Sequence, residues 1–365
     1  MTEPHKAPGD LSNLLDGEPF SPYKILNHFD RLQAVAQGEN VFPITVEIDP
    51  ANVCNHRCEW CVSMLAHTGE RLDYEAFARL VEELERLEVR SVVLKGGGEP
   101  TVHPRFNDML ARLAETELAV GLITNGSMRR KGTLESILEC TDWVRVSLDA
   151  ARASTHEAIH GTKDFERILA NIKKLTQKSE NTLIGLNFVV EPRNYREMLP
   201  FTVMGKSLGV SYVSFRCVFD PGASISEGMK EEMRESVKRV KQLEESSYRV
   251  FTGNLSEPNL ESNAKQPFPY QRCLGPNLVG VVGADGEVYA CCFLRGNKQF
   301  SFGNVQEQSF ESLWCGERRQ ETMERVYRGE CGHICQGGMT SNRYHQYNQI
   351  LNYLRMESKV HAQFA

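Results

Sequence analysis

The stretch PANVCNHRCEWC, residues 50–61, directly follows the alternating run ITVEID. It holds three cysteines, separated by three and then two residues: Cys54, Cys58 and Cys61. Thiolates are soft ligands that favour zinc, copper(I) or iron–sulfur clusters. Three of them are one short of a closed tetrahedral site. Either His56 or His67 completes a zinc site, or one metal position stays open for another molecule.

Composition restricts the class of protein. The 365-residue chain is 41% hydrophobic and has a formal net charge of −6, so it can bury a large core and lacks the basic surface that binds nucleic acid. It has no run of about 18 apolar residues and no signal-peptide core, so we expect a cytoplasmic protein without a membrane segment. In a reducing compartment, eleven cysteines indicate metal binding rather than disulfides.

Six short apolar runs alternate with helical patterns between residues 43 and 220. Strands are expected at 44–48, 91–95, 119–124, 143–149, 183–190 and 212–218. Helices are expected between them, at 73–88, 104–113, 134–138, 164–175 and 195–207. Because no strand is polar enough to have one wet face, the pattern predicts a parallel sheet with crossover helices. Six units are too few to close a TIM barrel. The expected fold is therefore α/β, with a partial (β/α)6 TIM-type barrel.

The rest of the chain divides around this barrel. A short β-hairpin is predicted in LVGVVGADGEVYACC (278–292), because its Asp-Gly step is a hairpin signal. A helix follows at 309–328. The expected units are an N-terminal extension (1–42), the barrel (43–220), a helical linker (221–270), a small hairpin-plus-helix domain (271–340) and a C-terminal tail (341–365).

The first cysteine motif also carries a family resemblance. CNHRCEWC resembles the Cys-x3-Cys-x-aromatic-Cys signature of radical S-adenosylmethionine (SAM) enzymes. A cubane [4Fe–4S] cluster held by three cysteines leaves one iron without a protein ligand. The resemblance implies that SAM chelates this iron through its amino and carboxylate groups. Reductive cleavage of SAM would then give a 5′-deoxyadenosyl radical. It also implies that Trp60 lies near the adenine; the alternative is that Trp60 packs beneath the cluster loop.

A glycine-rich turn and two strand ends agree with this resemblance. KGGGEP (95–100) follows the second strand, where glycines let the backbone approach a ligand closely and Glu99 could accept from an ammonium. Its place matches the Gly-Gly-Glu motif that holds the SAM amino group in the family. The residues so implied are Gly97, Gly98 and Glu99. Asn125 ends the third strand. Ser147, at the end of the fourth, resembles a residue that contacts the ribose or carboxylate of SAM. For both Asn125 and Ser147, loop capping is the alternative.

A second cysteine set lies near the C-terminus: Cys273, Cys291, Cys331 and Cys335. Its spacing, with Gly286 five residues before Cys291, resembles the twitch domain, the shortened relative of the SPASM domain of radical SAM enzymes. This implies one auxiliary [4Fe–4S] cluster, closed by four protein ligands, in addition to the SAM-binding cluster. A zinc ribbon is the alternative. Cys292 is expected on the opposite strand face from Cys291, and Cys315 as a small apolar residue within a helix.

The identity of the substrate is what the sequence determines least. Barrel, linker and single four-cysteine site resemble 2-deoxy-scyllo-inosamine dehydrogenase-type enzymes, which implies oxidation of a secondary alcohol. The small-molecule substrate would be a sugar, aminocyclitol or nucleotide-sugar, with flavodoxin or ferredoxin as electron donor. Arg216 is the candidate for holding the substrate hydroxyl; a salt bridge to Asp149 or Glu191 is its alternative role. Other possible functions are a maturase of a ribosomal peptide, a sugar epimerase or lyase, and a non-enzymatic metal-binding scaffold.

Overall fold

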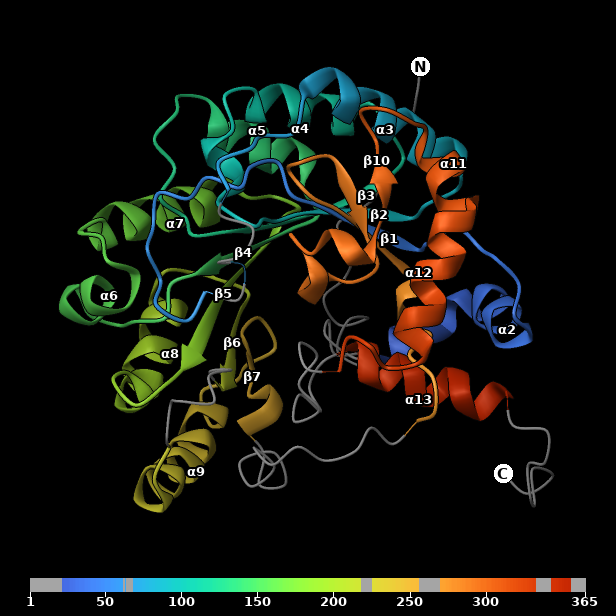
Figure 1. Ribbon diagram of the computed structural model, residues 1–365. Helices are drawn as coiled ribbons and strands as arrows, with labels where there is room; N and C mark the ends of the chain where they lie inside the picture. The colour runs from blue at the N-terminus through green and yellow to red at the C-terminus, as the bar shows by residue number, and fades with distance from the viewer. Residues whose placement is uncertain are drawn as a thin grey trace.

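One open sheet organises the molecule. The computed structural model describes residues 22–61, 63, 68–217, 225–255, 270–332 and 343–355. Ten strands follow each other in the order β10-β9-β8-β1-β2-β3-β4-β5-β6-β7, and the two end strands are not paired with each other (Figure 1). The strands are β1 (Thr45–Ile48), β2 (Ser91–Leu94), β3 (Ala119–Thr124), β4 (Trp143–Ser147), β5 (Leu183–Val190), β6 (Tyr212–Cys217), β7 (Arg249–Phe251), β8 (Val279–Val282), β9 (Glu287–Tyr289) and β10 (Ser301–Asn304).

The strands from β1 to β7 are all parallel to their neighbours. The expected α/β class and the partial barrel are therefore confirmed. β4 ends two residues earlier than expected because Asp149 takes a left-handed conformation, with φ 56°, which turns the chain out of the strand. β7 was not expected, since three residues give no readable alternation.

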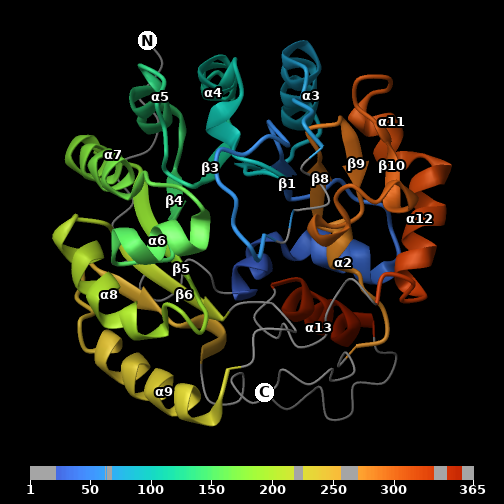
Figure 2. The same ribbon diagram turned by 60° about the vertical axis from the view of Figure 1, so that its left-hand side comes forward.

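Helices cover the outer face of the parallel strands (Figure 2). They are α3 (Tyr74–Arg86), α4 (Phe106–Ala114), α5 (Thr133–Cys140), α6 (Ala153–His160), α7 (Phe165–Lys178), α8 (Met198–Ser207) and α9 (Glu227–Lys241). α3 shows why they form. The Asp73 side chain caps its N-terminus by accepting from the Ala76 amide at 2.9 Å. Phe77, Leu80 and Leu84 recur at helical spacing and are buried against the sheet.

The side chains on the other face of each strand, away from the helices, point into the barrel. Two glycines leave space for aromatic rings of the neighbouring strands. A Cβ on Gly121 would stand 2.2 Å from the ring of Trp143, and one on Gly185 would stand 2.0 Å from the ring of Tyr212. Real Cβ atoms do not approach other atoms so closely, because the overlap is repulsive. The rings therefore occupy space that only glycine leaves open.

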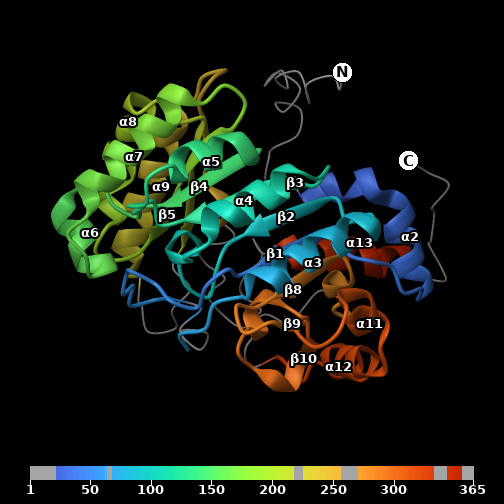
Figure 3. The same cartoon turned by 90° about the horizontal axis from the view of Figure 1, so that it is seen from above.

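The C-terminal hairpin continues the sheet of the barrel. β8 pairs in parallel with β1, from Thr45↔Val279 to Ile48↔Val282. β9 and β10 then follow as antiparallel strands. Figure 3 shows this part beside β1, with its helices outside it. These helices are α11 (Phe310–Cys315) and α12 (Glu317–Tyr327). The sequence predicted the hairpin but not its pairing, because periodicity does not identify a strand's partner.

The two ends of the described chain pack together. η1 (Pro22–His28) and α2 (Phe29–Gln37) lie against α13 (Arg343–Arg355), and Leu32, Val35 and Leu351 form part of a second apolar cluster. Short 3-10 turns complete the fold: η3 (Pro100–Val102), η4 (Tyr195–Glu197), η5 (Gly253–Leu255), η6 (Gly275–Asn277), η7 (Cys292–Leu294) and η8 (Lys298–Phe300). Among the described residues, none of the helices combines the length and apolar character needed to cross a membrane.

Candidate active site

The loop that carries the first three cysteines follows β1, and its two ends pair with each other. Ala51 and Arg71 form an antiparallel bridge. Beside them the amide of Asn52 donates to the Glu70 carbonyl at 2.9 Å, and the amide of Leu72 donates to the Pro50 carbonyl at 3.0 Å. This closed neck fixes both ends of the loop at the carboxyl edge of the sheet, where α/β folds place their chemistry. We call residues 50–72 the cluster loop; 62 and 64–67 lie outside the described residues.

The three cysteine thiols form one half-buried group. Burial raises the pKa of Cys54 to about 11 and also raises the pKa of Cys58 and of Cys61 above its usual value. The thiol of Cys61 adds to the increase at both Cys54 and Cys58. A bound metal reverses this penalty, because its positive charge stabilises thiolates. This soft three-thiol set therefore fits a cluster with one open iron.

The glycine-rich turn after β2 packs against the cluster loop. The amide of Gly98 donates to the Ala51 carbonyl at 2.9 Å, and the amide of Glu99 donates to the Val53 carbonyl at 2.9 Å. A Cβ on Gly98 would stand 2.1 Å from the Val53 carbonyl oxygen. Gly98 thus allows a close approach of the cluster-loop backbone, whereas the sequence suggested a close approach of a ligand. Gly97 is buried in the same turn.

Glu99 has a buried carboxylate that accepts four hydrogen bonds. Thr101 donates to Oε1 through its amide at 3.1 Å and its hydroxyl at 2.7 Å, and the Thr124 hydroxyl donates at 2.6 Å. The Asn125 amide donates to Oε2 at 2.7 Å. Burial raises the pKa of Glu99, and this effect exceeds the lowering by the four hydrogen bonds. A nearby cation would therefore stabilise the charged form of Glu99. Among the described residues, Oε2 accepts a single hydrogen bond and has a second lone pair, because a carboxylate oxygen carries two.

The two polar residues at the ends of β3 and β4 differ in their roles. Asn125 connects the cluster loop to β3, since its side-chain amide donates to Asn55 Oδ1 at 2.7 Å. Its own oxygen caps the turn by accepting from the Ser127 amide at 2.9 Å, as the capping alternative predicted. Ser147 is half-buried next to Asn187 of β5. Among the described residues its hydroxyl has no hydrogen-bond partner, so it can still contact a ligand.

A buried network centred on Asp164 holds the cluster loop to α6 and α7, and sequence reasoning missed it. Asp164 pairs with His56 Nε2 at 3.2 Å and His156 Nε2 at 3.1 Å. It also accepts from the hydroxyl of Thr162 at 2.7 Å and from that of Ser127. The available signal was a histidine inside the cysteine motif, together with two more in HEAIHG (156–161).

His160 contacts the cysteine group directly. Its Nδ1 lies 3.0 Å from Cys58 Sγ, and its Nε2 lies 3.1 Å from the Leu148 carbonyl and 3.3 Å from Asp149 Oδ2. Trp60 completes this side of the loop: its ring centroid is 6.4 Å from that of His160, in an edge arrangement. The guanidinium of Arg193 lies 5.8 Å from the Trp60 ring. Trp60 thus lies between the cluster loop, to which it belongs, and the side chains of His160 and Arg193.

Asp164→Asn is expected to lower the free energy of unfolding by about 3 kcal/mol at pH 7, because it breaks a buried charged network. Burial raises the pKa of Asp164, but hydrogen bonds from Ser127 and Thr162 and the electrostatic interaction with His56 outweigh burial, so the pKa is below its usual range. A group with a depressed folded pKa stabilises above its unfolded pKa and loses that effect as pH falls. Urea unfolding should therefore show the difference shrinking below about pH 4.

Asp108→Asn is the matched control for this experiment. Asp108 is exposed and pairs with Arg105 at 2.8 Å, so its replacement should cost less than about 0.5 kcal/mol. Equal losses in the two variants would contradict the structural importance of the Asp164 network.

Arg216 lies at the carboxyl end of β6 and is exposed. Its charge acts on Tyr212 together with that of Arg145, which places both arginines toward the inside of the barrel. The two carboxylates considered as its salt-bridge partners contact other side chains. Asp149 lies near His160, and Glu191 accepts from Arg193 Nε at 2.8 Å. A role for Arg216 toward substrate remains a proposal.

The auxiliary cysteines gather between the hairpin and the C-terminal helix. Cys273 interacts electrostatically with Cys291 and Cys331, and burial raises the pKa of Cys273 to about 12. Asn348 of α13 donates to Cys273 Sγ at 3.2 Å. Cys335 lies outside the described residues. The three described thiols are a soft donor set that fits an iron–sulfur cluster.

The arrangement of Cys291 and Cys292 differs from the expectation. They were expected on opposite strand faces, but β9 ends at Tyr289 and η7 begins at Cys292, so the alternation of a strand does not apply. The two thiols interact with each other, which raises the pKa of Cys291 and lowers the pKa of Cys292 to about 6. Cys315, expected to be a small apolar residue in a helix, is exposed at the end of α11.

Two family models match this chain. Residues 48–199 match the radical SAM superfamily, and residues 273–337 match SPASM, an iron–sulfur cluster-binding domain. The chain therefore combines a radical SAM domain with a SPASM domain, and it is a radical SAM enzyme. Its cofactors are SAM, a SAM-binding [4Fe–4S] cluster and auxiliary iron–sulfur binding in the SPASM domain.

Three curated relatives cover most of the chain. The tungsten-containing aldehyde ferredoxin oxidoreductase cofactor-modifying protein of Pyrococcus furiosus is 27% identical over 73% of this chain and 79% of its own length. The mycofactocin maturase MftC of Mycobacterium tuberculosis is 26% identical over 83% of this chain and 79% of its own length. The antilisterial bacteriocin subtilosin biosynthesis protein AlbA of Bacillus subtilis is 25% identical over 93% of this chain and 78% of its own length. None of these three bears out the expected likeness to inosamine dehydrogenase-type enzymes.

Solved structures show the same fold. SuiB of Streptococcus suis bound to S-adenosylmethionine superposes with a TM-score of 0.63 at 17% identity, covering 88% of this chain and 77% of SuiB. The anSMEcpe protein with bound AdoMet superposes with a TM-score of 0.60 at 18% identity, covering 85% and 95%.

Proposed function

We propose that this radical SAM enzyme is a maturase that modifies a ribosomally made peptide. The observation that carries the proposal is the similarity to MftC and AlbA, which covers 83% and 93% of this chain. The similarity therefore extends through both domains. The small sugar or cyclitol substrate expected from the sequence has no comparable support.

The open sheet is consistent with a polymeric substrate. β7 and β10 are the two ends of the sheet and are not paired with each other, so pairing does not close the barrel. β8 lies directly beside β1, which places the cluster loop and the SPASM hairpin on adjacent strands. A peptide lying across the carboxyl ends of these strands would contact both domains.

The chain's own residues would have separate tasks. Cys54, Cys58 and Cys61 would hold the first cluster. Once bound, this cluster and SAM supply a carbon radical that removes a hydrogen atom from the substrate. Glu99 would accept a hydrogen bond from the SAM ammonium at Oε2, and Arg216 would bind a polar group of the substrate.

Three assigned auxiliary ligands, together with Cys335, would enclose the second cluster completely. A closed cluster has no iron for substrate and is suited to accept an electron, so net oxidation of the peptide becomes possible. The electron donor for the first cluster would be a flavodoxin or ferredoxin.

A direct experiment is anaerobic incubation of the reconstituted enzyme with SAM, dithionite and each short peptide encoded beside its gene. We expect a SAM-dependent mass change of one peptide, such as a loss of about 2 Da for each crosslink formed by removal of two hydrogens, and formation of 5′-deoxyadenosine. A parallel panel of sugars and aminocyclitols serves as the comparison. If an alcohol in that panel is oxidised, with one 5′-deoxyadenosine per product, while every peptide stays unchanged, the maturase proposal is wrong.

A further inference from the structure

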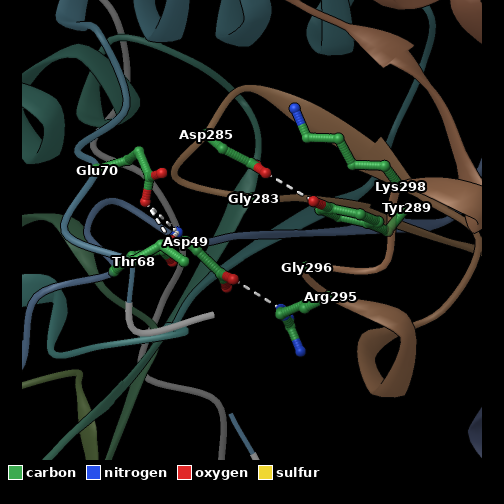
Figure 4. A pocket seen from close by; sticks show the side chains of 10 residues that line it. Asp49, Thr68, Glu70, Gly283, Asp285, Tyr289, Arg295, Gly296 and Lys298 are labelled. Carbon is green, nitrogen blue, oxygen red and sulfur yellow. Dashed lines mark hydrogen bonds and ion pairs between the residues drawn. The ribbon is translucent and has the colours of Figure 1, made fainter. Parts of the chain in front are cut away.

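A small pocket lies at the junction of the two domains, outside both cysteine groups. Its volume is about 90 Å3. Figure 4 shows its side chains converging from the base of the cluster loop on one side and from the hairpin on the other. Its lining is Asp49, Asn52, Thr68, Glu70, Gly283, Asp285, Tyr289, Arg295, Gly296 and Lys298.

The position of the pocket follows from strand pairing. Asp49 directly follows β1, and Gly283 directly follows β8. Because these two strands are parallel neighbours, their carboxyl ends meet at the same edge of the sheet. In open α/β sheets, ligands bind in the crevice outside these ends. The base of the cluster loop forms one wall of this crevice, so a ligand held there lies beside the loop that carries the first cluster.

The buried cation of the pocket is already engaged by the protein. The guanidinium of Arg295 lies 2.7 Å from Asp49 Oδ2 and 3.1 Å from Glu47 Oε2. It also donates to the Cys292 carbonyl at 2.8 Å. Two further carboxylates line the pocket, those of Glu70 and Asp285. The other lining cation, Lys298, is largely exposed, and its ammonium is 3.8 Å from Glu287. Carboxylates therefore dominate the lining.

Several hydrogen-bond donors of the pocket lining already bind acceptors that belong to the same lining. The Tyr289 hydroxyl donates to Asp285 Oδ2 at 2.6 Å, and the hydroxyl of Thr68 donates to Glu70. The side-chain amide of Asn52 donates to Glu70 at 3.4 Å. Asp49 Oδ2 and Arg295 Nε lack hydrogen-bond geometry but face each other as an ion pair at 2.7 Å, which leaves Asp49 Oδ1 and Asn52 Oδ1 over. Both residues are buried, with 0% and 5% exposure, and within the described parts of the chain neither atom has a hydrogen-bond donor.

Buried acceptors without donors are costly, so the chemistry of the pocket calls for a ligand that only donates. A primary ammonium has three N–H donors and no acceptor. A volume of about 90 Å3 is enough for several water-sized groups, so an ammonium with its first methylenes fits. Burial also raises the pKa of Asp49 and of Asp285, and a bound cation would offset this cost.

We infer that this pocket binds a primary ammonium of the substrate, either a lysine side chain or a peptide amino terminus. The inference rests on the proposed function, because it assigns a recognition group to the proposed peptide. It predicts that the modified peptide carries an amine that seats beside the cluster loop while another part of the peptide reaches the radical.

The test is calorimetric titration of the reconstituted enzyme with SAM bound. Four probes are used: Nα-acetyl-lysine methylamide, the norleucine compound that lacks the amine, triglycine amide, and its N-acetylated form. At least one amine should bind about tenfold or more tighter than its uncharged partner, as expected for charge-assisted hydrogen bonds. The lysine pair tests for a side chain, and the triglycine pair tests for an amino terminus.

Variants locate the binding. Glu70→Gln and Asp285→Asn should each weaken amine binding several-fold, and Lys298→Met should strengthen it by removing a like charge. Glu135→Gln is the control, because Glu135 pairs with Lys178 on the exposed surface and should leave binding unchanged. The gain with Lys298→Met cannot result from misfolding.

The inference is overturned if the amines and their uncharged partners bind equally, or if no amine binds and the pocket holds only water. It is also overturned if the three pocket variants bind the amines as the unmodified chain does. These outcomes do not depend on turnover. Modification of a peptide that has neither lysine nor a free amino terminus would leave the maturase proposal standing while removing the ammonium site.

Discussion

Replacing Cys54, Cys58 and Cys61 together by alanine should abolish SAM cleavage and remove one of two clusters. Two cubane clusters hold about eight irons per chain after anaerobic reconstitution, and the variant should retain about four. The physical reason is that the three thiols form one half-buried group on the cluster loop, whereas the auxiliary cysteines belong to another part of the fold. Iron analysis and 5′-deoxyadenosine quantification measure the two effects separately.

The matched control is Cys140→Ala. Cys140 ends α5 and belongs to neither cysteine group, so this variant should keep its iron and its SAM cleavage. Zinc in place of iron in the unmodified protein would refute the cluster assignment, as would unchanged 5′-deoxyadenosine formation in the triple variant.

Gly98→Ala should reduce SAM cleavage by about a hundredfold or more while leaving most of the fold intact. The added methyl carbon would stand 2.1 Å from the Val53 carbonyl oxygen, and this neighbour is backbone that cannot rotate away. The cluster loop must shift, although catalytic geometry tolerates little displacement. Displacing it also breaks the hydrogen bonds from the Gly98 and Glu99 amides to the loop. Activity, SAM affinity and circular dichroism of the variant distinguish local displacement from unfolding.

Gly228→Ala is the corresponding control. Gly228 lies in α9, where the nearest atom to an added Cβ is 4.0 Å away, and alanine is the better helix former. This variant should keep full activity and be slightly more stable. If Gly98→Ala were as active as the control, the cluster loop would not depend on the close packing described above.

The amino-acid sequence was sufficient to predict those parts of the fold that depend on local pattern. Strands such as 119–124 and 183–190 were predicted with their observed bounds, because their apolar runs are continuous and flanked by turns. The cysteine spacing and the turn after β2 predicted which segments meet. That inference needed only the rule that carboxyl ends of parallel strands share an edge.

Contacts between distant segments could not be predicted in this way. Asp164 lies 108 residues from His56, and although His56 stands out inside the cysteine motif, nothing in that motif identifies Asp164 as its partner. The reason for a glycine at position 98 is likewise a backbone atom from another loop. The faces of Cys291 and Cys292 were wrongly predicted because the strand that was expected to carry them ends at Tyr289.

The pairing of β8 with β1 bears on how the chain could be shortened. β1 precedes the cluster loop and lies between β2 and β8, so it is an inner strand only because the C-terminal part is present. A truncation before residue 278 would leave the backbone amides and carbonyls of one side of β1 unsatisfied, forming an edge ready to pair with another molecule. The radical SAM domain expressed alone should therefore self-associate, because the SPASM domain also serves as the cover of this edge.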